Sequence, residues 1–320
     1  MDIKKIGILT SGGDAPGMNA IIYSVVKNAK KNNIDVIGIY RGYNGLIHGN
    51  LTPLSLMDVN NIVQRGGTIL YSDRCLEFKT EKGLEKAKKT CSEQGIDALI
   101  VVGGDGTFRG AYDLFKLGVP CVGLPGTIDN DISCTEYTLG YDTAVNTAVE
   151  MVDKLCDTVT SHDRCSVVEV MGRRSGYIAL YVGMSCGASY IVTREVEFNE
   201  EYLFSKMKEE LSYGKKSFII VVAEGLLDVF ELAKKIEKET GVESRATVLG
   251  HVQRGGSPTV KDRVIGTRFG ARAVELLVSG KYGMVIGLKD NKLVEYEIPK
   301  GLEIKKEFPK DLYEVAKGLF

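Results

Sequence analysis

Short apolar runs rich in valine and isoleucine recur along the whole chain, and they limit its fold more than any other feature. Each run is four to six residues long, which suits a strand buried on both faces better than a helix. We therefore expect buried parallel strands at residues 6–9, 36–40, 98–102, 121–124, 166–170, 218–223 and 284–288.

Amphipathic stretches separate these runs and are long enough for the helices that connect parallel strands. They occupy residues 83–94, 143–157, 200–213 and 228–240. A further helix is predicted at 258–279, with Ser257 as its N-cap, Pro258 at its first position and Gly280 after its last turn. This alternation of strands and helices predicts an α/β fold.

Length and composition narrow the classes of function. The 320 residues predict two domains, because one hydrophobic core seldom grows beyond about 250 to 300 residues. A formal net charge of -1 gives no global field for a polyanion, so we expect no nucleic-acid partner. The 7 cysteines form no C-x-x-C pair, which disfavours disulfides or zinc and suits a cytoplasmic protein. The apolar burst at 6–9 is too short for a signal peptide or membrane span, so no membrane partner is expected.

A glycine-rich loop follows the first run and leads into a helix. It reads T-S-G-G-D-A-P-G-M-N at residues 10–19. Ligands of open α/β sheets bind outside the carboxyl ends of the strands, and glycines there let backbone amides approach an anion. The pattern indicates a phosphate site, with a plain strand-to-helix turn as the alternative.

A second glycine loop, G-G-D-G-T at 103–107, follows the run at 98–102. Its carboxylate, Asp105, is a natural Mg²⁺ ligand, since that ion usually takes only one or two carboxylates. The spacing of this loop is not G-x-G-x-x-G, and the chain has no G-x-x-x-x-G-K-[ST] loop, which argues against a dinucleotide enzyme and a P-loop NTPase. A structural turn is the alternative.

The third loop, P-G-T-I-D-N-D at 125–131, follows the run at 121–124. Phosphoryl transfer to a hydroxyl needs one carboxylate that holds the hydroxyl and accepts its proton. Asp129 suits that role, and a solvated Asp-rich turn is the alternative.

Together these three loops resemble the bacterial ATP-dependent phosphofructokinases. The likeness continues through V-E-V-M-G-R at 168–173, A-E-G at 223–225 and R-A-T-V-L-G-H-V-Q-R-G-G-S-P at 245–258, so it covers nearly the whole chain. The loop G-G-D-G alone would be weak, because lipid and NAD kinases carry a similar one.

This resemblance implies transfer of the γ-phosphoryl group of ATP to the 1-hydroxyl of fructose 6-phosphate, a step of glycolysis, with Mg²⁺ as cofactor. It also implies two Rossmann-like three-layer α/β/α domains with an active-site cleft between them. The ATP-binding domain would comprise 1–140 plus 253–303, and the fructose 6-phosphate-binding domain 141–252 plus 304–320.

The resemblance also implies the site residues. Asp105 would hold Mg²⁺, Asp129 would be the general base, and Thr127, Arg74 and Arg173 would complete the catalytic group. The ATP-binding residues would be Gly13, Tyr43, Arg74, Cys75, Gly104, Asp105, Gly106, Thr107 and Gly110, where Gly110 would leave room for the nucleotide. The substrate-binding residues would be Thr127, Ile128, Asp129, Asp131, Arg164, Met171, Gly172, Arg173, Glu224, Arg245, His251, Val252, Gln253 and Arg254.

Two glycines bear on the phosphoryl donor. Pyrophosphate-dependent relatives carry Asp at the position of Gly106 and Lys at the position of Gly126, where charged side chains would occupy space needed by ADP. Glycine at both positions therefore favours ATP.

Members of this family are typically homotetramers with an effector site for ADP or phosphoenolpyruvate at a subunit interface. Arg164 and Arg245 resemble residues that reach the 6-phosphate from a neighbouring subunit. The effector site would retain the positive charges of Lys27, Lys215 and Lys216. Since fewer Arg forks weaken anion binding, we expect diminished or altered control. Positions where relatives often place an effector ligand read Tyr23, Leu56, Cys156, Ser189 and Tyr213.

Two alternatives remain open. The first is an enzyme of the same fold with another donor or acceptor, such as pyrophosphate or a different ketohexose phosphate, because fold does not fix substrate. The second is a catalytically silent nucleotide or sugar-phosphate sensor. Intact Asp105, Asp129, Arg74 and Arg173 argue against the sensor, which needs no general base aligned with a metal ligand.

Overall fold

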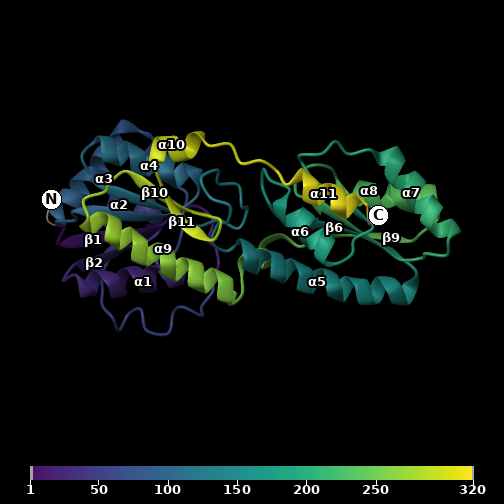
Figure 1. The fold of residues 1–320 in the computed structure, drawn as a ribbon, viewed down its shortest axis with the longest axis horizontal. Coiled ribbons are helices and arrows are strands. Elements are labelled where there is room, and N and C mark those ends of the chain that lie inside the picture. The colour runs from purple at the N-terminus through teal and green to yellow at the C-terminus, as the bar shows by residue number, and fades with distance from the viewer. Residues whose placement is uncertain (1–2, 319–320) are drawn as a thin grey trace. The chain divides into compact units, whose positions relative to one another are not determined.

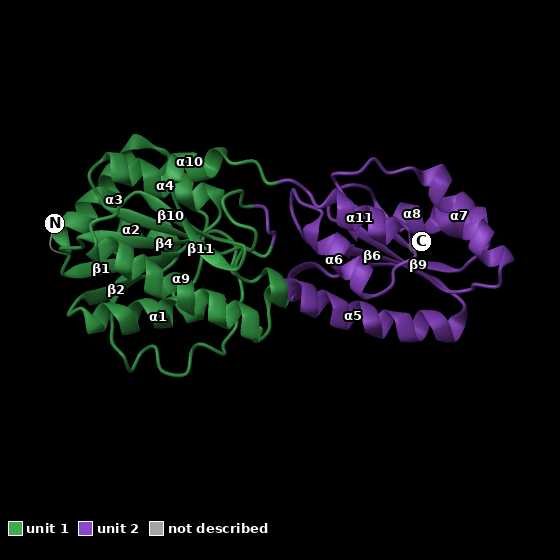
Figure 2. Ribbon diagram, in the orientation of Figure 1, with its two compact units in different colours: residues 1–128, 132–143, 254–306 green, residues 129–131, 144–253, 307–320 purple. Residues whose placement is uncertain are grey.

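The computed structural model describes residues 3–318 and divides into two compact units. Unit 1 contains residues 1–128, 132–143 and 254–306, and unit 2 contains 129–131, 144–253 and 307–320, within the described range (Figure 2). Each unit has one sheet with helices packed against it (Figure 1). The expectation of two α/β units is confirmed.

Unit 1 is built on a seven-stranded sheet in the order β11-β10-β5-β4-β1-β2-β3. The strands β1, β2, β4, β5 and β10 run parallel, and β3 and β11 pair antiparallel at the two edges. Their bounds are β1 Lys5–Thr10, β2 Asp35–Ile39, β3 Leu51–Leu54, β4 Ala98–Gly103, β5 Cys121–Pro125, β10 Met284–Lys289 and β11 Lys292–Glu297.

Helices cover both faces of this sheet. On one face α1 (Met18–Lys31) packs along α9 (Val260–Val278), and Figure 1 shows the two helices side by side. The other face carries an apolar core to which four helices contribute buried side chains. These are α2 (Gly42–His48), α3 (Glu81–Glu93), α4 (Asp105–Lys116) and α10 (Ile298–Glu303), with a 3₁₀ turn η1 at Glu77–Lys79.

Unit 2 is built on a four-stranded parallel sheet in the order β7-β8-β6-β9. The helices α7 and α8 bury apolar side chains against one face, with Phe218, Ile220 and Val222 of β8. On the other face α6 packs against β7 and β8, and α11 packs against α6. The bounds are α5 Tyr141–His162, β6 Cys165–Val170, α6 Tyr177–Ser185, β7 Tyr190–Val192, α7 Glu200–Ser212, β8 Phe218–Ala223, α8 Val229–Thr240, β9 Ser244–Val248, η2 Gly250–Arg254 and α11 Lys310–Lys317. Among residues 3–318, no helix is both long enough and apolar enough to cross a membrane.

Every predicted strand is present, and each pairs in parallel with a neighbour. The strands that the apolar pattern did not predict are β3, β7, β9 and β11, and all four lie at sheet edges. An edge strand has one neighbour and more contact with solvent, so its side chains need not be uniformly apolar. In β9, for example, Arg245 and Val248 are exposed.

The helix predicted at 258–279 is α9, but its start was placed wrongly. Thr259, and not Ser257, is the N-cap, because the Thr259 hydroxyl accepts a hydrogen bond from the Asp262 N–H. Ser257 instead donates its hydroxyl to the Gln64 carbonyl at 2.6 Å. The end was placed well, since Ser279 caps the helix and Gly280 follows with a left-handed φ of 78°.

Asp262 is a buried carboxylate that joins α9 to the start of α5. Its Oδ1 accepts hydrogen bonds from the Tyr137 hydroxyl at 2.8 Å and the Gly140 N–H at 2.7 Å. Its Oδ2 accepts from the N–H of Thr143 at 3.0 Å and from the hydroxyl of the same residue at 2.5 Å. Burial raises the pKa of Asp262, and these four donors act in the opposite direction.

We predict that Asp262→Asn lowers the melting temperature by about 3 to 12 °C. Each oxygen of the carboxylate accepts from one backbone N–H, so either orientation of the amide places its NH₂ group against an N–H that cannot accept a hydrogen bond. A lost hydrogen bond to a charged group costs about 1.5 to 3 kcal/mol, and each kcal/mol shifts the midpoint of a domain of this size by about 2 to 4 °C. Thermal unfolding of Asp262→Asn and of the exposed control Glu85→Gln measures this effect. Equal midpoints would contradict the prediction.

Candidate active site

The loop after β1 connects the sheet to the N-terminus of α1. Gly12 (φ 92°) and Gly17 (φ 100°) have left-handed backbone conformations, which glycine adopts without steric cost. The Ser72 hydroxyl donates to the Gly12 carbonyl at 2.6 Å, and the Gly12 N–H donates to the Asp73 carbonyl at 3.1 Å. The segment at 72–73, which the sequence analysis did not single out, therefore holds this loop in place.

Gly13 lies against the guanidinium group of Arg254. A Cβ atom at Gly13 would lie 2.6 Å from Arg254 Nη1, and the same nitrogen donates to the Asp14 carbonyl at 3.1 Å. Glycine permits this close approach, and a larger residue would displace the Arg254 guanidinium group. Arg254 was predicted to bind the sugar phosphate, and in this structure it supports the loop after β1.

The loop after β4 lies beside the loop after β1. The Ser11 N–H donates to the Val102 carbonyl at 2.9 Å, and the Thr107 hydroxyl donates to the Ser11 carbonyl at 3.4 Å. The chain runs from β1 outward to β2 and β3 and then returns to β4 on the other side of β1. Such a reversal of strand order is where open α/β sheets bind their ligands.

The N-terminus of α4 lies at this reversal. Gly104 is the N-cap, and Asp105 is the half-buried first residue of the helix. Free N–H groups and the helix dipole favour phosphate at such a position. One carboxylate beside a phosphate site also suits Mg²⁺, which takes one or two carboxylates and completes its shell with water and phosphate oxygens. Residues 3–318 contain no cluster of three or more His, Cys, Asp or Glu side chains that could hold a metal ion.

Tyr43 and Gly110 belong to the packing under α4. Tyr43 is buried, its ring stacks on Phe78 at 3.8 Å between centroids, and its hydroxyl donates to the Thr107 carbonyl at 2.6 Å. Burial raises the pKa of Tyr43. A Cβ atom at Gly110 would lie 2.7 Å from Phe78 Cε1 and 3.1 Å from Tyr43 Cε2. The space at Gly110 is therefore filled by aromatic rings, and the idea that this glycine leaves room for a nucleotide is not supported.

Gly106 and Gly126, the two glycines that bear on the phosphoryl donor, differ in the space around them. A Cβ atom at Gly106 would meet nothing within 4 Å, so the space above the first turn of α4 is open there. A Cβ atom at Gly126 would lie 2.8 Å from Val102 Cγ1 and 3.2 Å from Met18 Cε. Gly126 is therefore small for packing reasons, and the space argument for ATP rests on Gly106.

Arg74 and Cys75 follow the segment that supports the loop after β1. The Asp73 carboxylate accepts hydrogen bonds from the Arg74 N–H at 2.8 Å and from the Asn44 amide at 3.1 Å. The Arg74 side chain is exposed, and half-buried Cys75 packs against the core of unit 1. Asp73 thus fixes the backbone from which Arg74 extends.

The loop after β5 continues from unit 1 into unit 2. The Gly126 N–H donates to the Gly103 carbonyl at 3.0 Å, and the Thr127 N–H donates to the Leu139 carbonyl at 3.1 Å. Thr127 and the fully buried Ile128 therefore lie in unit 1, next to the loop after β4. The segment 129–131, with buried Asp129 and half-buried Asp131, groups with unit 2.

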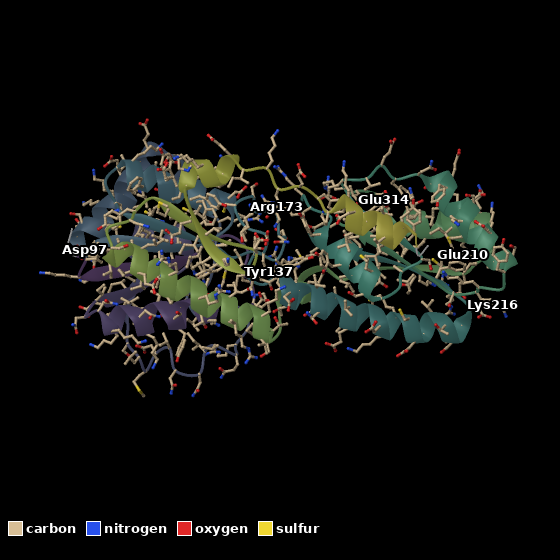
Figure 3. The ribbon with its side chains drawn as sticks, viewed as in Figure 1. Asp97, Tyr137, Arg173, Glu210, Lys216 and Glu314 are labelled. Carbon is tan, nitrogen blue, oxygen red and sulfur yellow. The ribbon has the colours of Figure 1, made fainter. Side chains whose placement is uncertain are left out.

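In unit 2, three predicted sugar-phosphate residues lie on the loop after β6, and Glu224 follows β8 beside it. Gly172 (φ 149°) and Arg173 (φ 57°) have positive φ angles, and the Arg173 N–H donates to Glu224 Oε1 at 2.5 Å. The Met171 N–H donates to Gln253 Oε1 at 3.3 Å. The exposed Arg173 is labelled in Figure 3. The loops after β6 and β8 are thus bonded to each other.

The turn η2 follows β9 at the same end of the sheet. His251 and Val252 are exposed, whereas Gln253 is fully buried. Its amide group donates to the Gly250 carbonyl at 3.1 Å and its carbonyl accepts from Met171. Gln253 therefore links η2 to the loop after β6, and a direct contact with substrate stays a prediction for it.

Arg164 and Arg245 lie at the opposite end of this sheet, where β6 and β9 begin. Arg164 Nε donates to Glu243 Oε2 at 2.9 Å, and Arg245 Nη2 donates to Glu243 Oε1 at 2.5 Å. The six residues of β6 separate this end from Met171, which at about 3.3 Å per residue is about 20 Å. Within unit 2, the two arginines are thus not brought together with Met171, Arg173 and His251.

Of the predicted effector residues, Lys215 and Lys216 are exposed and form ion pairs, whereas Lys27 is half-buried. Lys215 pairs with Glu210 at 2.7 Å and Lys216 with Asp163 at 3.5 Å, and Figure 3 labels Glu210 and Lys216. Lys27, in unit 1, lies 5.5 Å from the centroid of the Tyr23 ring. Their binding of an effector stays a prediction.

The structure belongs to the class of two-unit α/β proteins. In each unit the loops lie at the carboxyl ends of parallel strands, and in unit 1 the geometry of these loops suits a phosphate group. The phosphofructokinase family model matches residues 5–277 of the chain. The chain is 52% identical over 317 residues to ATP-dependent 6-phosphofructokinase 1 of Clostridium perfringens and 51% identical over 321 residues to ATP-dependent 6-phosphofructokinase of Bacillus cereus, covering 99% of both chains in each case. This protein belongs to the phosphofructokinase family.

Solved structures agree on the fold. Phosphofructokinase from Saccharomyces cerevisiae is 34% identical with a TM-score of 0.87, matching 99% of this chain and 46% of that longer chain. This chain thus spans about half the length of the yeast protein. Pyrophosphate-dependent phosphofructokinase from Marinobacter aquaeolei is 20% identical with a TM-score of 0.85, over 99% and 91% of the two chains. Because that likeness shows the fold alone, the fold does not decide the phosphoryl donor.

We predict opposite effects of the same substitution at two glycines of α4. Gly110→Ala forces Phe78 or Tyr43 to move and should destabilise unit 1 by about 1 to 3 kcal/mol, as overpacking does. Gly106→Ala enters open space and should be neutral or stabilise by up to about 1 kcal/mol, because alanine favours a helix. Thermal unfolding of both variants measures the contrast. Equal midpoints would show that the space at Gly110 is not limiting.

Proposed function

We propose that this protein is an ATP-dependent 6-phosphofructokinase, which transfers the γ-phosphoryl group of ATP to the 1-hydroxyl of fructose 6-phosphate. The observation that carries the proposal is identity of about half of all residues, over the full length, to proteins of that name. The open space above Gly106, beside the N-terminus of α4, favours ATP over pyrophosphate as donor.

The nucleotide is assigned to the loops after β1 and β4. Phosphate oxygens would accept hydrogen bonds from N–H groups around Gly13 and Gly104 to Thr107, where the dipole of α4 is favourable. Asp105 would hold Mg²⁺, which when bound neutralises charge on the transferred phosphoryl group. Exposed Arg74, set by Asp73, would place a further positive group beside the phosphates. Tyr43 and Gly110 serve this site by packing under α4.

The sugar phosphate is assigned to the loops after β6, β8 and β9 and to the segment after β5. Asp129 would accept the proton of the 1-hydroxyl as that oxygen attacks, and Thr127 would orient the transferred group. Arg173 would stabilise the charge that spreads over the phosphoryl oxygens. Met171, Gly172, Glu224, His251 and Asp131 would hold the sugar.

Arg164 and Arg245 are proposed to bind the 6-phosphate of a neighbouring subunit. The supporting observation is their place at the amino ends of β6 and β9, about 20 Å along the strand from the loop after β6. The planar guanidinium of arginine suits the geometry of phosphate. Arg164 and Arg245 both donate to the Glu243 carboxylate, so their guanidinium groups lie close enough together for a phosphate to contact both. We further propose that the protein is a homotetramer that acts in glycolysis in the cytoplasm. Its control by effectors would be diminished or altered.

The first test is the activity of the native protein and of Asp129→Ala. With ATP and Mg²⁺, the native protein should phosphorylate fructose 6-phosphate, and Asp129→Ala should lower kcat by about 10² to 10⁴-fold, because positioned acid–base groups contribute about that much. Glu85→Gln, on an exposed face of α3, is the matched carboxylate control and should retain native kcat.

Other outcomes would change the assignment in distinct ways. Turnover with pyrophosphate and none with ATP would refute the donor. Turnover of another ketohexose phosphate alone would refute the acceptor, and no turnover with any donor would favour a sensor. Native activity in Asp129→Ala would refute only the assignment of Asp129 as the general base.

The shared-site assignment predicts complementation between inactive variants. Asp129→Ala and Arg245→Ala should each have little activity. When the two are unfolded together, mixed and reassembled, some sites should receive an intact Asp129 from one chain and an intact Arg245 from another. Activity of the mixture above the sum of the two separately treated proteins measures this. If mixing restores none while native protein recovers after the same treatment, Arg245 does not act across an interface.

A further inference from the structure

A buried serine reaches the backbone of the proposed catalytic base. Ser175 is 6% exposed and lies on the loop after β6, and its hydroxyl donates to the Asp129 carbonyl at 2.7 Å. The two residues are 46 positions apart in sequence and both belong to unit 2. The bond is therefore a tertiary contact between the sugar-phosphate loop and the segment of the base.

The bonded carbonyl belongs to a peptide with little freedom of its own. It joins Asp129 to Asn130, whose φ of 50° is left-handed, and Asn130 is buried. Asparagine adopts this conformation more readily than most residues with a side chain, and the burial of Asn130 limits the movement of the peptide. A hydrogen bond to this carbonyl fixes ψ of Asp129, and with it the direction of the Cα–Cβ bond that carries the carboxylate.

The serine is itself held from two sides. The Ser175 N–H donates to the Gly172 carbonyl at 2.9 Å, and the next residue, Gly176, donates its N–H to Glu195 Oε1 at 2.8 Å. A Cβ atom at Gly176 would lie 2.4 Å from Glu195 Oε2, so the loop lies pressed against that side chain. Because the loop that carries Ser175 is fixed, the hydrogen bond from its hydroxyl restrains the Asp129 peptide.

We propose that Ser175 is a positioning residue for the base, which aligns the Asp129 carboxylate with the acceptor hydroxyl. This inference rests on the proposed function, because it takes Asp129 as the general base. The contact lies within unit 2, with which 129–131 groups although residues 128 and 132 belong to unit 1. The Asp129 carboxylate thereby keeps a fixed position relative to Met171, Gly172 and Arg173, the residues assigned to binding of the acceptor.

The first experiment is a series of substitutions at Ser175 that separates hydrogen bonding from volume. Ser175→Thr keeps the hydroxyl, Ser175→Cys has a weaker donor, and Ser175→Ala has none. We expect kcat to fall about 10- to 100-fold in Ser175→Ala, since small displacements of a catalytic group have effects of that size. Ser175→Cys should be intermediate and Ser175→Thr close to native, while KM for ATP stays unchanged. A kcat that follows side-chain volume instead would overturn the proposal.

The matched control is Ser24→Ala in unit 1. Ser24 is 1% exposed and its hydroxyl donates to the Thr267 carbonyl at 2.6 Å, so it loses the same kind of buried bond. Both alanine variants should lose a similar, small amount of thermal stability, and only Ser175→Ala should lose kcat. Equal loss of kcat in both would assign the effect to general destabilisation.

The deciding experiment is a double-mutant cycle with Asp129→Ala. If Ser175 acts through Asp129, then adding Ser175→Ala to Asp129→Ala should lower kcat by less than about twofold, because the group being positioned is already gone. The same fold-loss in both backgrounds would overturn the positioning role. Native kcat in Asp129→Ala alone would instead refute the proposed base. Should Ser175→Ala fail to fold, Ser175→Cys carries the same cycle.

Discussion

Parallel pairing of β1 with β4 brings two glycine-rich loops side by side, and the arrangement of unit 1 around the candidate site depends on it. The register sets Leu9 beside Val101 and Thr10 beside Val102, so the two strands end together. Because the chain reverses direction across the sheet at this pair, the helices that follow the two strands, α1 and α4, lie on opposite faces of the sheet. The N-terminus of α4 is thereby left facing the loop after β1, which is the geometry a phosphate requires.

The pattern of apolar residues predicted the interior of both sheets because burial on two faces leaves few side-chain choices. It could not predict β3, β9 and β11, since edge strands accept polar residues, and β7 is apolar and buried but has only 3 residues. The start of α9 was wrong for a related reason. Ser257 and Thr259 are both good N-caps in isolation, and the choice between them is made by a tertiary contact, the bond from Ser257 to Gln64.

The candidate site was predicted in part because its glycines and carboxylates lie in motifs along the chain. The supporting residues are not in those motifs. Ser72 and Ser175 donate to backbone carbonyls far away in sequence, and Asp73 accepts from the N–H of its neighbour Arg74. Any small polar side chain in a loop gives the same local signal. For Gly110 the motif predicts the residue type but not the structural reason for it. Its place in a motif indicates that a glycine is needed, but only the positions of Phe78 and Tyr43 give the reason.

Backbone strain marks the same loops independently of any motif. Positive φ is common for Asn and Asp in turns and uncommon for other side chains. Among residues 3–318, the non-glycine residues with positive φ that are neither Asn nor Asp are Arg41, Tyr71 and Arg173. Arg41 precedes α2 with Tyr43, Tyr71 precedes the segment at 72–73, and Arg173 lies on the loop after β6.

Each of these strained residues is held by a specific bond. The Arg41 N–H donates to the Leu70 carbonyl at 2.8 Å, the Thr10 hydroxyl donates to the Tyr71 carbonyl at 2.7 Å, and the Arg173 N–H donates to Glu224 Oε1 at 2.5 Å. A conformation that costs on the order of 1 kcal/mol or more persists only where its surroundings impose it. Such strain gathers at ligand-binding loops. Two of the three residues lie next to residues that support or form the loops proposed to bind the nucleotide, so the backbone conformation distinguishes these loops from ordinary surface turns.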